Sequence, residues 1–163
     1  MTNTNRCHLK GTITVLLLII FFALALSMFI EFFTLDHGME IKRLNKEAER
    51  LATRLYFDKM TTLAQLATAL LGGLWAFLSL AKTKVKIKGC ATITCFILAN
   101  ISLCLSLLIY AFGYNFIVER IFYHACFDID APIVRFVQNY QQLFFLIGSL
   151  CLIPTIIFGR ETP

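Results

Sequence analysis

The chain has 163 residues, of which 58% are hydrophobic and only 15% are charged, and its formal net charge is +5. A soluble domain of this size is normally only about 45–50% apolar. The composition therefore excludes an ordinary soluble domain and indicates an integral membrane protein. Four apolar runs approach the length of about 20 residues that a helix needs to cross a bilayer. They are residues 11–35, 60–81, 90–112 and 139–158.

The first run follows Arg6 and Lys10 and contains Ala23-Leu24-Ala25, a combination that resembles a cleavable signal peptide. Apolar sequence continues beyond this triplet to Leu35, so we expect a retained membrane span. Apart from Ala23 and Ser27, large apolar side chains dominate the run, and we expect it to face lipid.

Residues 39–59 combine many charges of both signs with a single apolar stripe, which predicts an amphipathic helix. No Gly or Pro follows until Gly72, so this outer helix is expected to continue into the second span as one rod over residues 39–81. The stripe requires a partner helix, which residues 113–138 could supply; a position along the membrane surface is the alternative. The stripe consists of Ile41, Leu44, Ala48, Leu51 and Leu55.

A short loop at residues 82–89 carries four lysines in "KTKVKIK". Basic residues close to span ends favour the cytoplasmic side, which places both termini in the cytoplasm. We expect the loop to contact anionic lipid headgroups or a cytoplasmic partner protein, and we expect no direct contact with nucleic acid. The lysines are Lys82, Lys84, Lys86 and Lys88.

The second outer segment, residues 113–138, has helical character on both sides of a turn at "DIDAP". Asp130 is a suitable N-cap, and Pro132 suits the first turn of the last helix. The aromatic residues that gather here form either a belt at headgroup level or a protein contact surface. The predicted fold is an all-α membrane protein: one domain over residues 1–163, a bundle of four transmembrane helices, with helices two to four extended into an extramembrane helical cap.

Stripes of small residues mark the second, third and fourth spans. Helices in lipid associate through such stripes, because lipid is as apolar as leucine. We expect these stripes to meet, either within one chain or between copies in a homo-oligomer. The predicted packing residues are Gly72, Ala76, Ala99, Ser102, Ser106 and Gly148.

Polar residues within the spans are few: Glu31, Gln65 and Asn100. Such groups are candidates for function. Hydrogen bonding between helices, or extension of Glu31 to the interface, explains them more simply, and pore lining is the alternative. The absence of a charge at the centre of any span argues against a proton relay.

Catalytic and metal-binding patterns are absent from the sequence. Neither outer segment has two cysteines, so neither can form an internal disulfide. The segment "HACFDID" contains four potential ligands, His124, Cys126, Asp128 and Asp130, but their spacing matches no metal motif. We therefore expect no enzyme, no cofactor and no metal.

The run "YFDKMTTLAQLATALLGGLWAFLSLAKTKVKIKG" joins a helical lead-in, a span with small residues and a tight basic turn. In this it resembles small four-span bacterial membrane proteins of anti-phage systems, such as the Kiwa transmembrane component KwaA and the phage exclusion protein RexB. The resemblance is one of architecture, and it implies an oligomer in the bacterial inner membrane that senses envelope disturbance and signals to a cytoplasmic effector. The leading hypothesis is thus a non-enzymatic sensor or scaffold. The alternatives are a small oligomeric ion channel that depolarises the membrane and an accessory subunit of a membrane enzyme.

Overall fold

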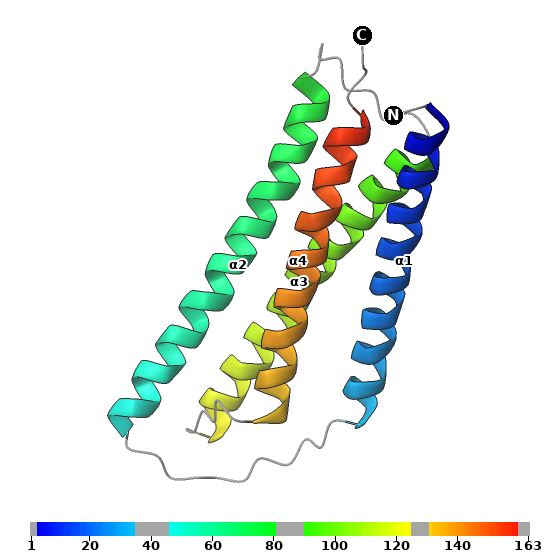
Figure 1. Cartoon of the computed structure of the whole chain (residues 1–163). Coiled ribbons are helices and arrows are strands. Elements are labelled where there is room, and N and C mark those ends of the chain that lie inside the picture. Colours follow the sequence, from blue (N-terminus) through cyan, green and yellow to red (C-terminus); the bar gives the residue numbers. More distant parts are fainter. Residues whose placement is uncertain (1–2, 35–45, 81–89, 125–130, 160–163) are drawn as a thin grey trace.

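The structure is a computed structural model that describes residues 3–34, 46–80, 90–124 and 131–159. These residues form four helices that alternate in direction, so the start of α1 and the end of α4 lie at the same end of the molecule (Figure 1). The predicted all-α, four-helix fold is confirmed. The helices are α1 (Asn3–Thr34), α2 (Lys46–Leu80), α3 (Cys90–His124) and α4 (Pro132–Gly159).

Three of the helices are long and apolar enough to cross a membrane, which makes the chain a multi-pass helical membrane protein. The apolar segments are Gly11–Thr34 of α1, Cys90–Glu119 of α3 and Pro132–Ile157 of α4. α2 is not among them over its described residues, so the predicted span at residues 60–81 stays a prediction.

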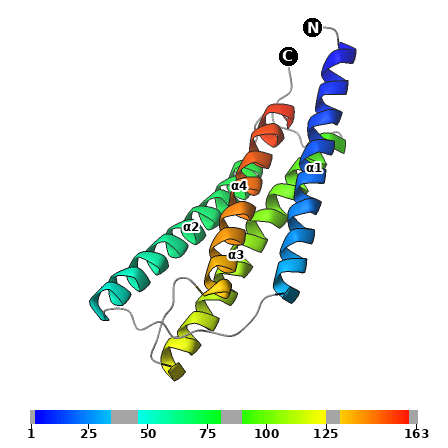
Figure 2. The ribbon, with the colours of Figure 1, turned by 60° about the horizontal axis from the view of Figure 1, so that its bottom comes forward.

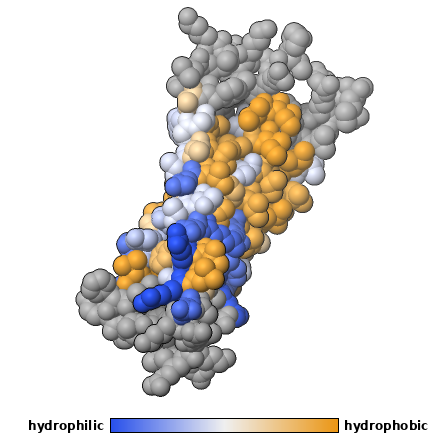
Figure 3. Space-filling view, turned by 90° about the vertical axis from the view of Figure 1, so that its left-hand side faces the viewer, coloured by the Kyte–Doolittle hydropathy of each residue, from blue (hydrophilic) through white to orange (hydrophobic). Residues whose placement is uncertain are grey.

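α2 joins a charged half to an apolar half without interruption. Its first half carries Glu47, Arg50, Arg54, Asp58 and Lys59. Figure 3, which views the α2 side of the molecule, shows hydrophilic residues gathered over the lower part and hydrophobic residues over the upper part. We call the end of the bundle where α1 ends and α2 begins the lower end (Figure 1).

α4 begins with Pro132, whose ring suits the first helical position because no N–H is needed there. The backbone N–H groups of Val134 and Arg135 donate to the carbonyl oxygen of Ala131, at 3.0 Å and 3.2 Å. Asp130, the predicted N-cap, lies outside the described residues.

α3 and α4 form the central pair of the bundle and pack very closely at two glycines. A Cβ added at Gly148 would lie 2.6 Å from Cγ of Leu103, and one at Gly113 would collide with the Val137 side chain. Glycine therefore permits the two backbones to approach at both points, which is the kind of packing that joins helices in lipid.

α1 and α2 flank this pair on opposite sides, as the views in Figures 1 and 2 both show. Each contacts both central helices, and over the described residues the two do not contact each other. The four helices are therefore not equivalent. α3 and α4 contact each other and both flanking helices, whereas α1 and α2 each contact only the central pair.

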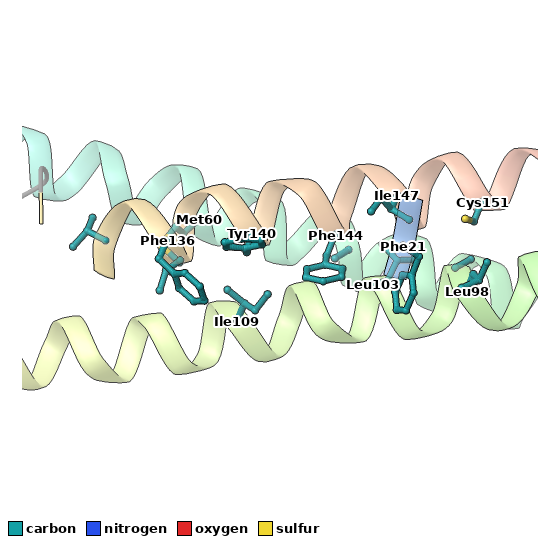
Figure 4. Packing of buried hydrophobic residues seen from close by; sticks show 14 of the residues in the cluster. Phe21, Met60, Leu98, Leu103, Ile109, Phe136, Tyr140, Phe144, Ile147 and Cys151 are labelled. Carbon is teal, nitrogen blue, oxygen red and sulfur yellow. The ribbon is translucent and has the colours of Figure 1, made fainter. Parts of the chain in front are cut away.

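The hydrophobic core lies along the α3–α4 contact. Figure 4 shows Leu103 and Phe144 between the two helices, with Phe21 reaching them from α1. The rings of Phe21 and Phe144 meet edge to face, with their centroids 6.1 Å apart. α2 contributes Met60, which is fully buried.

Apart from this contact, most of α1 is exposed on the surface of the bundle. Only 11% of its apolar segment is buried, against 50% of that of α4. Large apolar side chains such as Ile19, Phe22 and Phe33 are more than half exposed. A surface of this kind suits a bilayer, in agreement with the expectation that the first span faces lipid.

Candidate functional site

A cluster of polar side chains joins α1 to α4 toward the lower end. The Tyr140 hydroxyl donates to Oε2 of Glu31 at 2.6 Å, and the Ser27 hydroxyl lies 3.0 Å from the same Tyr140 oxygen. A carboxylate only accepts, so Tyr140 uses its single hydrogen on Glu31 and Ser27 donates to Tyr140. We call Ser27, Glu31 and Tyr140 the α1–α4 clasp.

The spacing of the two clasp residues on α1 matches the period of an α-helix. Ser27 and Glu31 are four residues apart on α1 and therefore share one face of the helix. Glu31 itself is exposed, while Tyr140 is buried against the core. The clasp thus connects a side chain at the rim of the protein to its interior.

A second set of hydrogen bonds ties α2 to the central pair. Gln141 is fully buried, and its Nε2 donates to the backbone oxygen of Met60 at 3.0 Å. The Ser106 hydroxyl donates to the backbone oxygen of Gln141 at 3.0 Å. Through Gln141 and its neighbour Tyr140, one turn of α4 is bonded to each of the other three helices.

Tyr56 provides a further bond from α2, because its hydroxyl donates to the backbone oxygen of Val134 at 3.3 Å. Burial raises the pKa of Tyr56, so its hydroxyl keeps its proton, and remains a donor, to a higher pH than that of an exposed tyrosine.

Two buried polar atoms in this region have no hydrogen-bond partner among the described residues: Oε1 of Gln141 and Oγ of Ser102. An unpaired buried acceptor costs about 1–3 kcal/mol. Gln141 therefore contributes less to stability than its bond to α2 alone would suggest.

Among the polar residues predicted within the spans, Asn100 forms a hydrogen bond between two helices. Its Oδ1 accepts from Nε1 of Trp75 on α2 at 3.0 Å, and its Nδ2 donates to the Phe96 carbonyl at 2.8 Å. Glu31 belongs to the clasp, and Gln65 is exposed on α2.

The predicted packing residues divide into two groups. Those of α3 and α4 lie buried in the central contact: Ala99, Ser102, Ser106 and Gly148. Those of α2, Gly72 and Ala76, are exposed, and no atom lies within 4 Å of a Cβ added at Gly72. Within one chain, therefore, the small-residue stripe of α2 does not contact the small-residue stripes of α3 and α4.

α2 instead packs through a different stripe. A helix turns by about 100° per residue, so the face that bears Gln65, Gly72 and Ala76 points away from the one that packs on the central pair. The packing face is larger and more apolar. It consists of Tyr56, Met60, Ala64, Ala67 and Leu74.

The expectation that the outer stripe packs on the second outer segment is also wrong where the structure describes it. Leu51 and Leu55 are each 60% exposed rather than packed on the second outer segment. Tyr56 holds the contact with α4, and Leu55 lies about 100° around the helix from it. The side chain of Ala48 and the residues Ile41 and Leu44 lie outside what the structure describes, as do Lys82, Lys84, Lys86 and Lys88.

Three residues of the site escaped the sequence reasoning. The sequence alone did not single out Tyr140 or Gln141, and Ser27 was counted only as a small residue. The polar run "QNYQQ" at the start of an apolar span was a usable signal, because buried amides in a span need partners.

The described residues contain no group of three His, Cys, Asp or Glu side chains that could hold a metal ion. Cys95 and Cys151 are buried free thiols, and the side chains of the "HACFDID" segment lie outside the described part of the chain. The polar cluster can hold the helices in register and couple the rim of α1 to the core.

Comparisons with protein-family models, with curated proteins and with solved structures found no match.

Tyr140→Phe tests the clasp, because it keeps the ring and removes the hydroxyl. We expect the free energy of unfolding to fall by about 1 kcal/mol, the scale of a hydrogen bond between membrane helices. The measurement is the thermal unfolding midpoint of the purified protein in detergent.

Tyr114→Phe is the matched control, since Tyr114 is half exposed and its ring packs on Phe57 and Tyr110. An unchanged midpoint in Tyr140→Phe, equal to that of this control, would contradict the role of the clasp.

Proposed function

We propose that the chain is a non-enzymatic, oligomeric membrane scaffold that senses the envelope through α1 and signals to a cytoplasmic partner. The observation that carries this proposal is the unequal attachment of the helices. α3 and α4 form a closely packed pair, whereas α1 is mostly exposed and is attached at a few points: Thr14 near its start, Phe21 in its middle and the clasp near its lower end. An element held in this way responds to a change at the membrane rim while the pair stays intact.

In the proposed arrangement α2 supplies a fourth span through its apolar half. Ala67 and Leu74 of that half are buried against the bundle, as expected for a helix that crosses the bilayer beside α3. The charged half then stands outside the membrane. Because α2 is continuous, a movement of its charged half is transmitted along the same rod into the bilayer.

The orientation follows from the distribution of lysines. Four of them between residues 82 and 88 favour a cytoplasmic upper end, which places the clasp near the opposite surface. The basic loop would then be the docking site for a soluble effector.

The outward face of α2 supports the oligomer. Gln65, Gly72 and Ala76 point away from the bundle, so small and polar groups lie where lipid would otherwise be. Small residues permit a close approach of helices, and an amide in hydrocarbon gains from a partner. A second copy of the chain provides both.

The same face favours an ion channel as the second candidate. The centre of a single chain is filled by side chains such as Leu103 and Phe144, which are fully buried. A pore would therefore have to form between copies, lined by Gln65 and Thr68, both exposed on α2.

A role in anti-phage defence in the bacterial inner membrane is the most specific part of the proposal, and it rests on the resemblance of residues 56–89 alone. Plaque counts on bacteria that express the chain with its neighbouring reading frames would test that part separately.

Gly72→Leu tests the oligomer interface. A leucine there prevents close approach, so we expect the mass of the complex in native mass spectrometry to fall toward that of the monomer. Gly11→Leu is the control, because Gly11 is also exposed with no atom within 4 Å of an added Cβ. The α2 interface is wrong if Gly72→Leu leaves the mass unchanged.

Electrical recording separates scaffold from channel. The scaffold predicts no unitary currents when the purified oligomer is reconstituted in planar bilayers. Reproducible currents that change in Gln65→Leu would replace the scaffold with the channel.

A further inference from the structure

An apolar groove runs between α1 and α3 toward the lower end, with a volume of about 420 Å³. This is within the range of roughly 300–1,000 Å³ that is usual for small-molecule sites. The groove is open along one side, and every side chain that lines it is apolar. Its walls include Phe29 and Phe33 from α1, Leu108 and Phe112 from α3, and Phe136 from α4.

Aromatic contacts shape the floor of the groove. The Phe32 ring lies with its centroid 6.2 Å from that of Phe112 and 5.9 Å from that of Phe136, so it touches both central helices. Phe29 and Phe33 pack on each other along α1, with their centroids 4.6 Å apart. The space beside these rings is not filled by other described side chains.

The location of the groove determines what fills it. Both of its main walls belong to apolar segments that are long enough to span a membrane, Gly11–Thr34 and Cys90–Glu119. Hydrocarbon chains surround such segments, and water does not enter an apolar cleft among them. The groove has no polar group to orient a headgroup, so its chemistry selects the apolar part of a lipid.

We propose that this groove is a binding site for one acyl chain of a membrane phospholipid. A concave, aromatic-walled site contacts the chain on several sides, whereas the convex surfaces of α1 and α4 contact a lipid on one side only. A chain in the groove would contact both α1 and α3. The site does not depend on the proposed sensing role.

The test uses the full chain reconstituted in phosphatidylethanolamine and phosphatidylglycerol vesicles that contain a trace of phosphatidylethanolamine with a diazirine on one acyl chain. After illumination, labelled peptides are identified by mass spectrometry. We expect the peptides that hold residues 28–33 and 105–112 to be labelled several-fold more than those that hold residues 15–22 and 150–157, which also carry apolar side chains that are more than half exposed.

Leu108→Trp fills the groove from α3 and should remove at least half of this preferential labelling. Leu150→Trp is the control, since Leu150 is similarly exposed on α4 and lies outside the groove. Even labelling over all exposed apolar residues, or preferential labelling that persists in Leu108→Trp, would overturn the proposal. So would protection of residues 105–112 by a cross-linked second copy of the chain.

Discussion

The contact between α3 and α4 is the constraint on which the rest of the structure depends. Inside a bilayer the hydrophobic effect does not hold helices together, so they must fit closely enough to gain more dispersion energy than lipid offers. Gly113 and Gly148 allow this fit by admitting the Val137 and Leu103 side chains where a Cβ would exclude them. Along α3 the buried residues Ala99, Ser102 and Ser106 are small, which keeps the distance between the two helices short.

The other two helices use this pair as a support, and they do so differently. α2 packs an apolar stripe on it and is bonded at Tyr56 and Gln141. α1 places Phe21 against the core, and its hydrogen bonds to the pair are those of the clasp toward the lower end and one between Thr14 and Cys95 toward the upper end. The hydrogen bonds of the clasp, of Tyr56 and of Gln141 thus fall on one short stretch of α4, residues 134–141, while Trp75 of α2 and Thr14 of α1 bond to α3. A change in this stretch would reach every helix of the bundle, which gives the proposed sensor a physical basis.

Much of the fold was predictable because it depends on local pattern. Long apolar runs and the absence of Gly and Pro from the charged segment predict helices, and small residues at helical spacing predict the buried face of α3. Which stripe of α2 faces the bundle was not predictable, because α2 has two candidate stripes and the choice depends on the shape of the α3–α4 surface. Leu51 and Leu55 have the spacing of a packing face, yet Tyr56 and Met60 occupy the contact. The clasp was missed for a related reason: Tyr140 is more than 100 residues from Ser27 and Glu31 in the chain, and the three come together only when α1 lies beside α4.

Disulfide cross-linking tests the central contact most directly. In a chain whose native cysteines are replaced by alanine, Gly113→Cys and Val137→Cys would bring two thiols together, because a Cβ at position 113 lies 3.1 Å from that of Val137. Val137→Cys removes one of the two methyl groups that a Cβ at position 113 would meet, and a small outward shift gives the Cβ separation of about 3.5–4.5 Å that a disulfide needs. We expect rapid intramolecular oxidation of this pair in membranes, and little when Val137→Cys is replaced by Arg135→Cys on the exposed face of α4. Absence of the intramolecular disulfide between positions 113 and 137, with both thiols present and reactive, would contradict the central pair and with it the arrangement of all four helices.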